Sequence, residues 1–357
     1  MPPSRIIVDC DLGIDDTTSL VMLLRDESVC VEAITVVDGN IPASAGVLAA
    51  LRVLLLMDKL ESVPVYLGAE TPLLPGIASK ECWPGHGPDG LGGFSNRTDE
   101  WAAFCALHLP EERLLNLSAE KEHAVTALLR MVNAAPGEIT ILALGPLTNI
   151  ALALSLDPSF LSKVKALVVM GGATSARGNS NRTAEFNFHC DPESVHVVLH
   201  AASKLPLEST PKVTLVPWET TVDHAVPWTF FDRIVGRNAN KPAPSKYAQF
   251  FQSYVKFYED ADRKKATATQ EAPLLPIERY YRNHEQFIMC DMYATDPSAI
   301  TEFRDFNAQI ELGGTHSRGL LTFNWHDYSV PPALPNCRVI FGVDNGKVLD
   351  ALERAFE

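Results

Sequence analysis

The chain has 357 residues, of which 46% are hydrophobic and 21% are charged, and its formal net charge is -14. A chain of this length and composition can bury a large core, and we expect a single soluble domain over residues 1–357. The negative charge disfavours binding to nucleic acid or to a membrane surface. Seven scattered cysteines, without a CxxC pair, and the absence of a signal-like N-terminal segment favour a cytoplasmic protein.

Apolar stretches alternate with helix-periodic segments through the first half of the chain. The expected strands cover residues 6–8, 31–37, 63–67, 139–144 and 166–170, and the expected helices cover residues 17–24, 43–60 and 148–156. This alternation predicts an α/β fold with a mainly parallel central sheet and helices on both faces. The carboxyl ends of parallel strands share one edge of the sheet, where we expect the ligand site.

Two segments do not follow this alternation and are candidate lids over the strand ends. Residues 72–96 are rich in Gly and Pro and contain His86, for which an ordinary surface position is the alternative. Residues 238–283 have a mostly helical pattern with many aromatic and charged side chains.

Four carboxylates lie within eight residues directly after the first expected strand, in Asp9-Cys10-Asp11-Leu12-Gly13-Ile14-Asp15-Asp16. Like charges at this spacing repel strongly, and a hard cation bound through oxygen atoms would relieve the repulsion. Helix capping by Asp15 and Asp16 is the alternative, and it explains two of the four at most. The cluster therefore predicts a metal site.

Later polar residues also follow expected strand ends or stand in apolar surroundings. The alternation in Glu185-Phe186-Asn187-Phe188 predicts an extended segment with Glu185 and Asn187 on one face. These side chains suit the vicinal hydroxyls of a sugar, and an edge strand with a solvated face is the alternative. Asp291 lies in an apolar stretch and needs a partner, either a metal ion or a helix N-terminus.

Taken in order, these motifs resemble one enzyme family. The acidic run is similar to the DxDxGxDD signature of the nucleoside hydrolases, the inosine-uridine preferring family. The resemblance extends over roughly residues 5 to 300, through Gly39-Asn40, the run from Leu144 to Ala151, Val169 to Gly172, Glu185 to Asn187, Asp191 to Glu193, and Asp291.

The resemblance implies a nucleoside hydrolase fold with its active site at the C-terminal strand ends and a Ca²⁺ ion at the base of the pocket. It implies four ligands to the ion: Asp11, Asp16, Asp291 and the backbone carbonyl of Leu144. It implies substrate contacts from Asp15, Asn40, His86, Met170, Asn179, Glu185, Asn187 and Cys290. With Asp11 as general base, water would cleave the N-glycosidic bond of a nucleoside to free base and ribose.

Cys290 stands immediately before the last metal Asp, where many members of the family have His, and this indicates a subgroup with Cys at that position. In apolar surroundings a thiol is a poor acid. We therefore expect bases that leave after protonation at N7, and predict a purine nucleosidase of nucleoside salvage that prefers inosine and guanosine. We also expect a homo-oligomer, either a dimer or a tetramer.

Two other functions fit parts of the sequence. A haloacid-dehalogenase-like phosphatase would use Asp9 as its nucleophile with Mg²⁺, because a DxD motif also follows the first strand there. A non-catalytic nucleoside- or sugar-binding protein would bind the same ligands without turnover.

Overall fold

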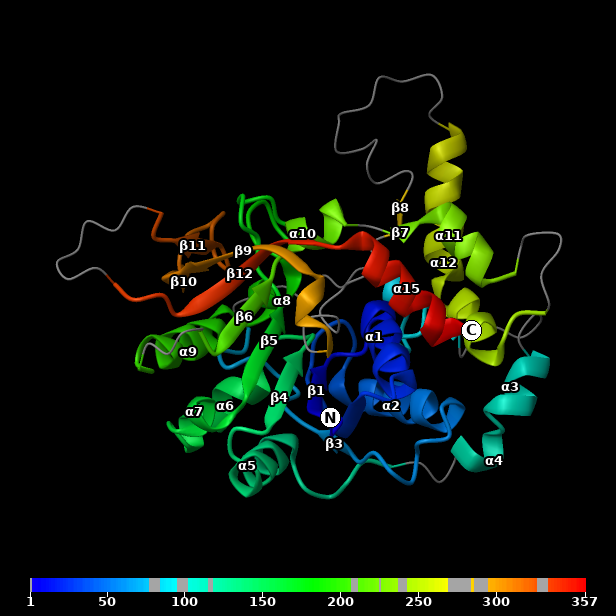
Figure 1. Ribbon diagram of the computed structural model, residues 1–357, viewed down its shortest axis with the longest axis horizontal. Coiled ribbons are helices and arrows are strands. Elements are labelled where there is room, and N and C mark those ends of the chain that lie inside the picture. The colour runs from blue at the N-terminus through cyan, green and yellow to red at the C-terminus, as the bar shows by residue number, and fades with distance from the viewer. Residues whose placement is uncertain are drawn as a thin grey trace.

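The computed structural model describes residues 2–76, 84–94, 102–114, 118–206, 211–224, 226–236, 243–268, 284–285, 295–325 and 333–357. Its centre is an eight-stranded sheet (Figure 1). In spatial order the strands are β3 (Val65–Leu67), β2 (Val29–Val36), β1 (Ser4–Cys10), β4 (Ile139–Ala143), β5 (Ala166–Met170), β6 (Val213–Val216), β12 (Cys337–Val343) and β9 (Ile300–Phe306). Neighbours run parallel except β12 and β9, which are antiparallel. The predicted fold class is confirmed.

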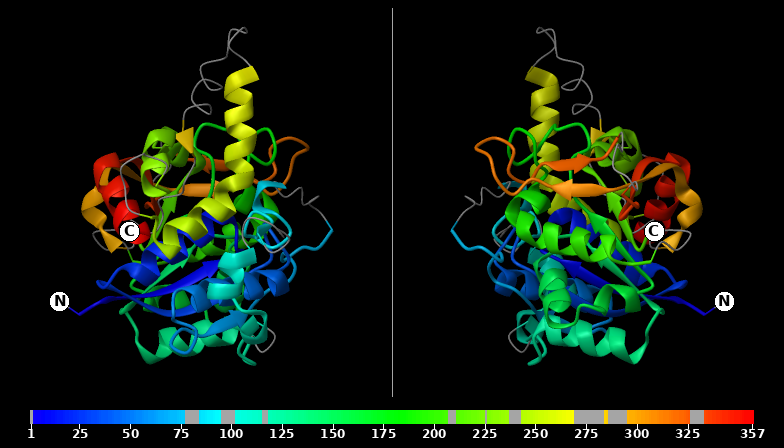
Figure 2. Two further views of the ribbon diagram at one scale, coloured as in Figure 1. Left: turned by 90° about the vertical axis from the view of Figure 1, so that its right-hand side faces the viewer. Right: turned by 90° about the vertical axis from the view of Figure 1, so that its left-hand side faces the viewer.

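Helices cover both faces of this sheet (Figures 1 and 2). One face packs against α1 (Ile14–Arg25), α2 (Ala43–Leu56), α11 (Trp228–Ile234), α12 (Lys246–Ala268) and α15 (Asn345–Phe356). The other face packs against α5 (Ala124–Ala134), α6 (Thr148–Leu156), α7 (Phe160–Lys163) and α9 (Pro192–Ser203). Successive side chains of β1 point to opposite faces of the sheet. Ile6 and Val8 pack in the core on the first face, and Ile7 packs in the core on the second.

The remaining elements of the described residues are short. They are α3 (Ala102–His108), α4 (Glu111–Leu114), α8 (Phe186–Cys190), α10 (Trp218–Asp223), the pair β7 (Val226–Pro227) and β8 (His284–Glu285), and the pair β10 (Ala308–Ile310) and β11 (Leu321–Phe323). Among the described residues, 3-10 turns cover Pro84–His86 and Pro297–Ala299.

The strand order places the turning point of the sheet beside β1, which pairs with β2 on one side and β4 on the other. The chain leaves β1 into α1 on one face, and it leaves β4 into α6 on the opposite face. This is a topological switch point, and open α/β sheets bind ligands at the carboxyl ends of the strands there.

Two expected elements near the strand ends need correction. Helix α1 begins at Ile14, earlier than residue 17, so that Asp15 and Asp16 lie in its first turn. The extended segment expected at Glu185–Phe188 is wrong, because Phe186–Cys190 form helix α8. The Glu185 carboxylate accepts hydrogen bonds from the N–H groups of Asn187 and Phe188, and this N-cap outweighs the two-residue alternation.

The described parts of the two candidate lids pack against each other. Phe94 contacts Phe250 of α12 edge-to-face, with ring centroids 5.7 Å apart. The hydroxyl groups of Tyr254 and Thr18 lie 2.9 Å apart, which joins α12 to α1. The far end of α12 extends beyond the body of the molecule (Figures 1 and 2). In the described part of the chain, no helix is both long enough and apolar enough to cross a lipid bilayer.

Candidate active site

The acidic cluster lies at the switch point between β1 and β4. Asp11 follows β1 directly, and Leu12 next to it has a φ of 53°, a left-handed conformation that is costly for a residue with a Cβ. This turn redirects the chain from the strand into α1. After the neighbouring strand β4, a Cβ placed on Gly145 would lie 3.1 Å from the Cβ of Asp11, so the turn after Leu144 passes directly beside the Asp11 side chain.

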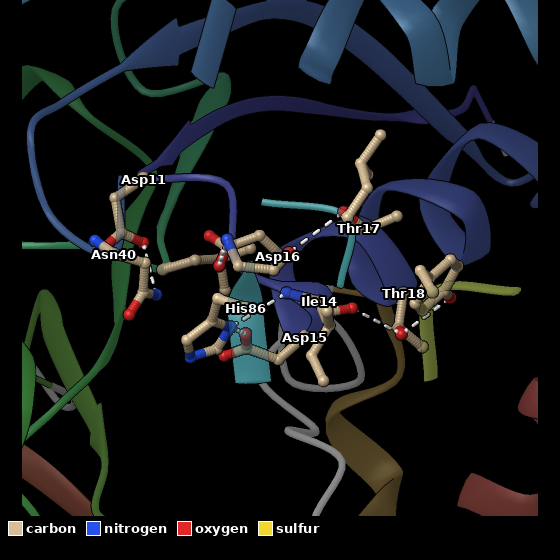
Figure 3. A network of polar contacts seen from close by, with 12 residues as sticks. Asp11, Ile14, Asp15, Asp16, Thr17, Thr18, Asn40 and His86 are labelled. Atoms are coloured by element: carbon tan, nitrogen blue, oxygen red, sulfur yellow. Dashed lines mark hydrogen bonds and ion pairs between the residues drawn. The ribbon is translucent and has the colours of Figure 1, made fainter. Parts of the chain in front are cut away.

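The loop after β2 fixes the orientation of Asp11. The backbone N–H of Asn40 donates to Asp11 Oδ2 at 2.6 Å, and Nδ2 of Asn40 lies 3.3 Å from Oδ1 (Figure 3). Gly39 permits this approach, because a Cβ at that position would overlap Asp11 Oδ2. Asp11 is fully buried. Asn40, expected to contact substrate, therefore also contacts the proposed general base.

Asp15 and Asp16 lie in the first turn of α1, and the Asp15 carboxylate points toward His86 (Figure 3). Asp16 Oδ2 accepts the Gly13 N–H at 2.8 Å, which is the capping role considered from the sequence, but the residue is fully buried. Burial, followed by repulsion from Asp11 and Asp15, raises the pKa of Asp16 well above its ordinary value. Oδ1 of Asp16 and Oδ1 of Asp15 are buried without a hydrogen-bond partner among the described residues.

Asn187 links the ends of β4 and β5. Its Nδ2 donates to the carbonyl oxygens of Leu144, at 2.7 Å, and Met170, at 3.1 Å. Its Oδ1 is buried and has no hydrogen-bond partner in the part of the chain that the structure describes. Three residues that the sequence places at the site, Leu144, Met170 and Asn187, are thus brought together by these bonds.

Glu185 acts as a structural anchor beside this group. Besides capping α8, its carboxylate accepts the N–H of Gly172 at 3.0 Å, which ties the end of β5 to the start of the helix. Burial raises the pKa of Glu185 to about 7, although its three backbone hydrogen bonds lower the pKa in part. Asn179 lies in the preceding loop, and its Oδ1 accepts the Phe186 N–H at 2.8 Å.

His86 lies beside the first turn of α1, with only 13% of its side chain exposed. The backbone N–H of Ile14 donates to His86 Nδ1 at 3.2 Å, so the neutral ring carries its proton on Nε2. Burial lowers the His86 pKa, and Asp15, with Oδ1 3.7 Å from Nδ1, raises it in part. The alternative of an ordinary surface histidine does not describe this position.

A second buried network of hydrogen bonds is centred on Asp9, at the end of β1 next to the acidic cluster. It was not identified from the sequence. Asp9 Oδ1 accepts hydrogen bonds from Thr35 Oγ1 at 2.6 Å and from Asn149 Nδ2 at 2.8 Å. Asn149 Oδ1 accepts the Ala69 N–H at 2.9 Å, so this amide joins β1, α6 and the segment after β3. The buried Asp at a strand end, together with Asn149 at the start of an expected helix, was the only signal available.

The residues present fit a hard cation in part. Asp11 and Asp16 are buried carboxylates, and the unpartnered Asp16 Oδ1 and the nearby Leu144 carbonyl are oxygen ligands of the kind that Ca²⁺ prefers. Asp291 and Cys290 lie outside the described residues. Within the described residues, no three His, Cys, Asp or Glu side chains form a complete metal site.

Comparisons with known proteins agree with this arrangement. The family model described as inosine-uridine preferring nucleoside hydrolase matches residues 6–350. The chain is 35% identical to Probable uridine nucleosidase 2 of Oryza sativa subsp. japonica over 264 residues, which cover 73% of this chain and 68% of that protein. It is 34% identical to the pyrimidine-specific ribonucleoside hydrolase RihB of Escherichia coli (strain SE11), over 58% of this chain and 59% of that protein.

Among solved structures, the protein is similar to an inosine-guanosine nucleoside hydrolase, with a TM-score of 0.77 and 29% identity over 99% of this chain and 98% of that one. The family model covers nearly the whole chain, including the acidic cluster, strands β1, β2 and β4 at the switch point, and α8. The chain belongs to the inosine-uridine preferring nucleoside hydrolase family.

Proposed function

We propose that the protein uses a resident Ca²⁺ ion to hydrolyse the N-glycosidic bond of ribonucleosides, releasing free base and ribose. The observation that carries this proposal is the convergence of two buried carboxylates, Asp11 and Asp16, beside the Leu144 turn at the switch point of the sheet. Family membership supports the reaction class.

In this proposal, Asp11, Asp16, the Leu144 carbonyl and Asp291 would hold the ion. When bound, Ca²⁺ would supply positive charge that offsets the carboxylate repulsion and polarises a water molecule. Asp11 accepts the proton of the attacking water, and the two contacts from Asn40 keep its carboxylate in one orientation for this step. As this proton leaves, the water oxygen bonds to the anomeric carbon and the bond to the base breaks. The base departs with the bonding electron pair and takes a proton at a ring nitrogen.

The sugar would lie between the first turn of α1 and the start of α8. Asp15 Oδ1 and Asn187 Oδ1 are acceptors that lack hydrogen bonds to the described protein residues, as expected of groups that receive ribose hydroxyls. His86, which lies beside Asp15, would be a further contact of the ribose. Asn179 and Glu185 complete the ribose contacts, with Met170 as the floor.

For the base, we propose a preference for inosine and guanosine, supported by the whole-chain similarity to the inosine-guanosine nucleoside hydrolase. The similarity to uridine nucleosidases favours uridine as the second candidate substrate. Tyr247, near the start of α12, lies away from the acidic cluster. Its ring centroid is 4.2 Å from the guanidinium carbon of Arg25, in the last turn of α1, whereas Asp15 and Asp16 lie in the first turn. Cys290 stays a predicted spectator in proton transfer.

The structure does not favour the phosphatase alternative. Asp9, its required nucleophile, is fully buried, and Thr35 and Asn149 occupy Oδ1. A phosphoryl group would have to enter the core of the protein to reach this carboxylate.

A substrate panel tests the proposed function. Release of free base from inosine, guanosine, adenosine, uridine and cytidine is measured with Ca²⁺ present, together with phosphate release from the corresponding monophosphates. We expect base release, fastest with inosine or guanosine, and no phosphate release. Faster hydrolysis of uridine would contradict the purine preference, and binding without turnover would indicate a sensor. Light scattering of the same sample tests the predicted dimer or tetramer.

A further inference from the structure

The loop that carries the proposed ribose contacts is held by a distant part of the chain. Residues 171–185 connect β5 to α8 and contain Asn179 and Glu185. Within this loop, Asn181 Oδ1 accepts the N–H groups of Thr183, at 2.8 Å, and Ala184, at 2.7 Å, so the loop folds around one amide.

The same loop is bound to the turn between β10 and β11, residues 311–320. Asn181 Nδ2 donates to the carbonyl oxygen of Arg318 at 3.1 Å, and Thr183 Oγ1 donates to the carbonyl oxygen of His316 at 2.8 Å. Two backbone carbonyls of this turn therefore bind the part of the loop that follows Asn179. Their own position depends on what holds the turn.

An ion pair ties the turn to α9. The Arg318 guanidinium donates from Nη1 and Nη2 to the two carboxylate oxygens of Glu193, at 2.8 and 2.7 Å, and from Nη1 to the Leu312 carbonyl at 2.7 Å. The side chains of Arg318 and Glu193 are only 15% and 16% exposed, so water screens the pair less than a surface pair. The bidentate geometry requires arginine.

Glu193 is itself connected to the catalytic edge of the sheet. It lies in the first turn of α9, and Asp191, the N-cap of this helix, accepts the Thr148 hydroxyl at 2.7 Å. Thr148 begins α6, directly after the turn that follows Leu144. A series of contacts thus connects the start of α6, through α9 and Arg318, to the 171–185 loop.

We propose that Arg318 is a positioning residue for sugar recognition, which holds the 171–185 loop in its binding position through Glu193 and the 311–320 turn. This inference rests on the proposed ribose contacts of Asn179 and Glu185. Losing the pair would let the loop move away from α8, so that the sugar would bind less tightly while the contacts to the base would be unaffected.

The test compares Arg318→Met with a matched control, Arg338→Met. Arg338 also forms a bidentate pair, with Asp305 at 2.8 and 3.0 Å and side-chain exposures of 19% and 30%, but it joins β12 to β9 away from the loop. Hydrogen exchange of the amides of residues 178–188 should become about tenfold faster in Arg318→Met and stay unchanged in Arg338→Met. Equal exchange in the two variants would overturn the proposal.

Inhibition constants provide the readout that a general loss of stability would not give. In Arg318→Met, we expect about tenfold weaker competitive inhibition by free ribose, a similar rise in KM for the best nucleoside, and unchanged inhibition by the free base. Arg318→Lys keeps the positive charge but cannot form the bidentate pair with Glu193. Its inhibition constant for ribose should lie between those of the wild type and Arg318→Met. If inhibition by ribose and inhibition by the free base weaken by the same factor, the proposal is overturned. If Arg318→Met fails to fold, Glu193→Gln takes its place.

The two proposals can fail separately. If the wild-type protein neither cleaves nucleosides nor binds ribose, the proposed function fails, whereas the exchange measurement still decides whether Arg318 holds the loop.

Discussion

Replacing Glu185 with Gln should change how the stability of the protein depends on pH. Burial raises the pKa of this carboxyl from 4.5 to about 7, so the folded state binds its proton more tightly than the unfolded state does. The contribution of this proton to stability is complete below the unfolded pKa and is lost as the pH rises through about 7. The amide of the Glu185→Gln variant does not titrate, so the variant lacks this loss.

The size of the effect follows from the shift. Between pH 5 and pH 8, titration of Glu185 should remove roughly 2–3 kcal/mol from the free energy of unfolding of the wild type. The Gln side chain has one acceptor oxygen in place of two, so the Gly172 and Phe188 N–H groups can keep their bond while the Asn187 N–H faces an amide donor. This lost bond should make the variant about 1–3 kcal/mol less stable at pH 5.

Urea unfolding of both proteins between pH 5 and pH 8, at fixed Ca²⁺, measures this difference. Other buried carboxyls also titrate, including Asp9, whose pKa burial raises to about 7, but they contribute equally to both proteins and cancel in the difference. We expect the stability of the wild type relative to the variant to fall by roughly 2–3 kcal/mol between pH 5 and pH 8, so that the variant reaches or overtakes the wild type at the higher pH. Parallel curves would refute the reasoning, because they would show that Glu185 does not titrate in this range.

Four further predictions concern the proposed site. Asp11→Ala should lower kcat by about 10²–10⁴-fold or more with the fold retained by circular dichroism; near-native rates with bound calcium would disprove its role as base. A strong chelator should abolish activity and lower Tm, with Ca²⁺ restoring both, whereas zinc or no metal in active enzyme would contradict this. His86→Ala should reduce kcat/KM without changing the Tm of the ligand-free protein, and unchanged kinetics would exclude a role in binding. Cys290→Ala should keep its rate within about tenfold, and a larger loss would make the thiol a participant in proton transfer.

Local patterns in the sequence determined the first half of the fold and the position of the site. Apolar runs predicted β1, β2, β4 and β5, and the helix expected at residues 148–156 coincides with α6. This succeeded because buried parallel strands and the helices between them repeat their hydrophobic pattern over short stretches of chain. The acidic run identified the edge of the sheet because like charges seldom lie so close without a partner.

Only the tertiary structure decided how side chains far apart in the sequence meet. Glu185 caps a helix, where alternation predicted an extended segment, because the Gly172, Asn187 and Phe188 N–H groups converge on its carboxylate. The contact of Asn181 with Arg318 spans 137 residues, and no local pattern encodes it. Such contacts depend on which strands pair and which helices pack, and these are set by burial of the whole core and not by the preference of any one segment.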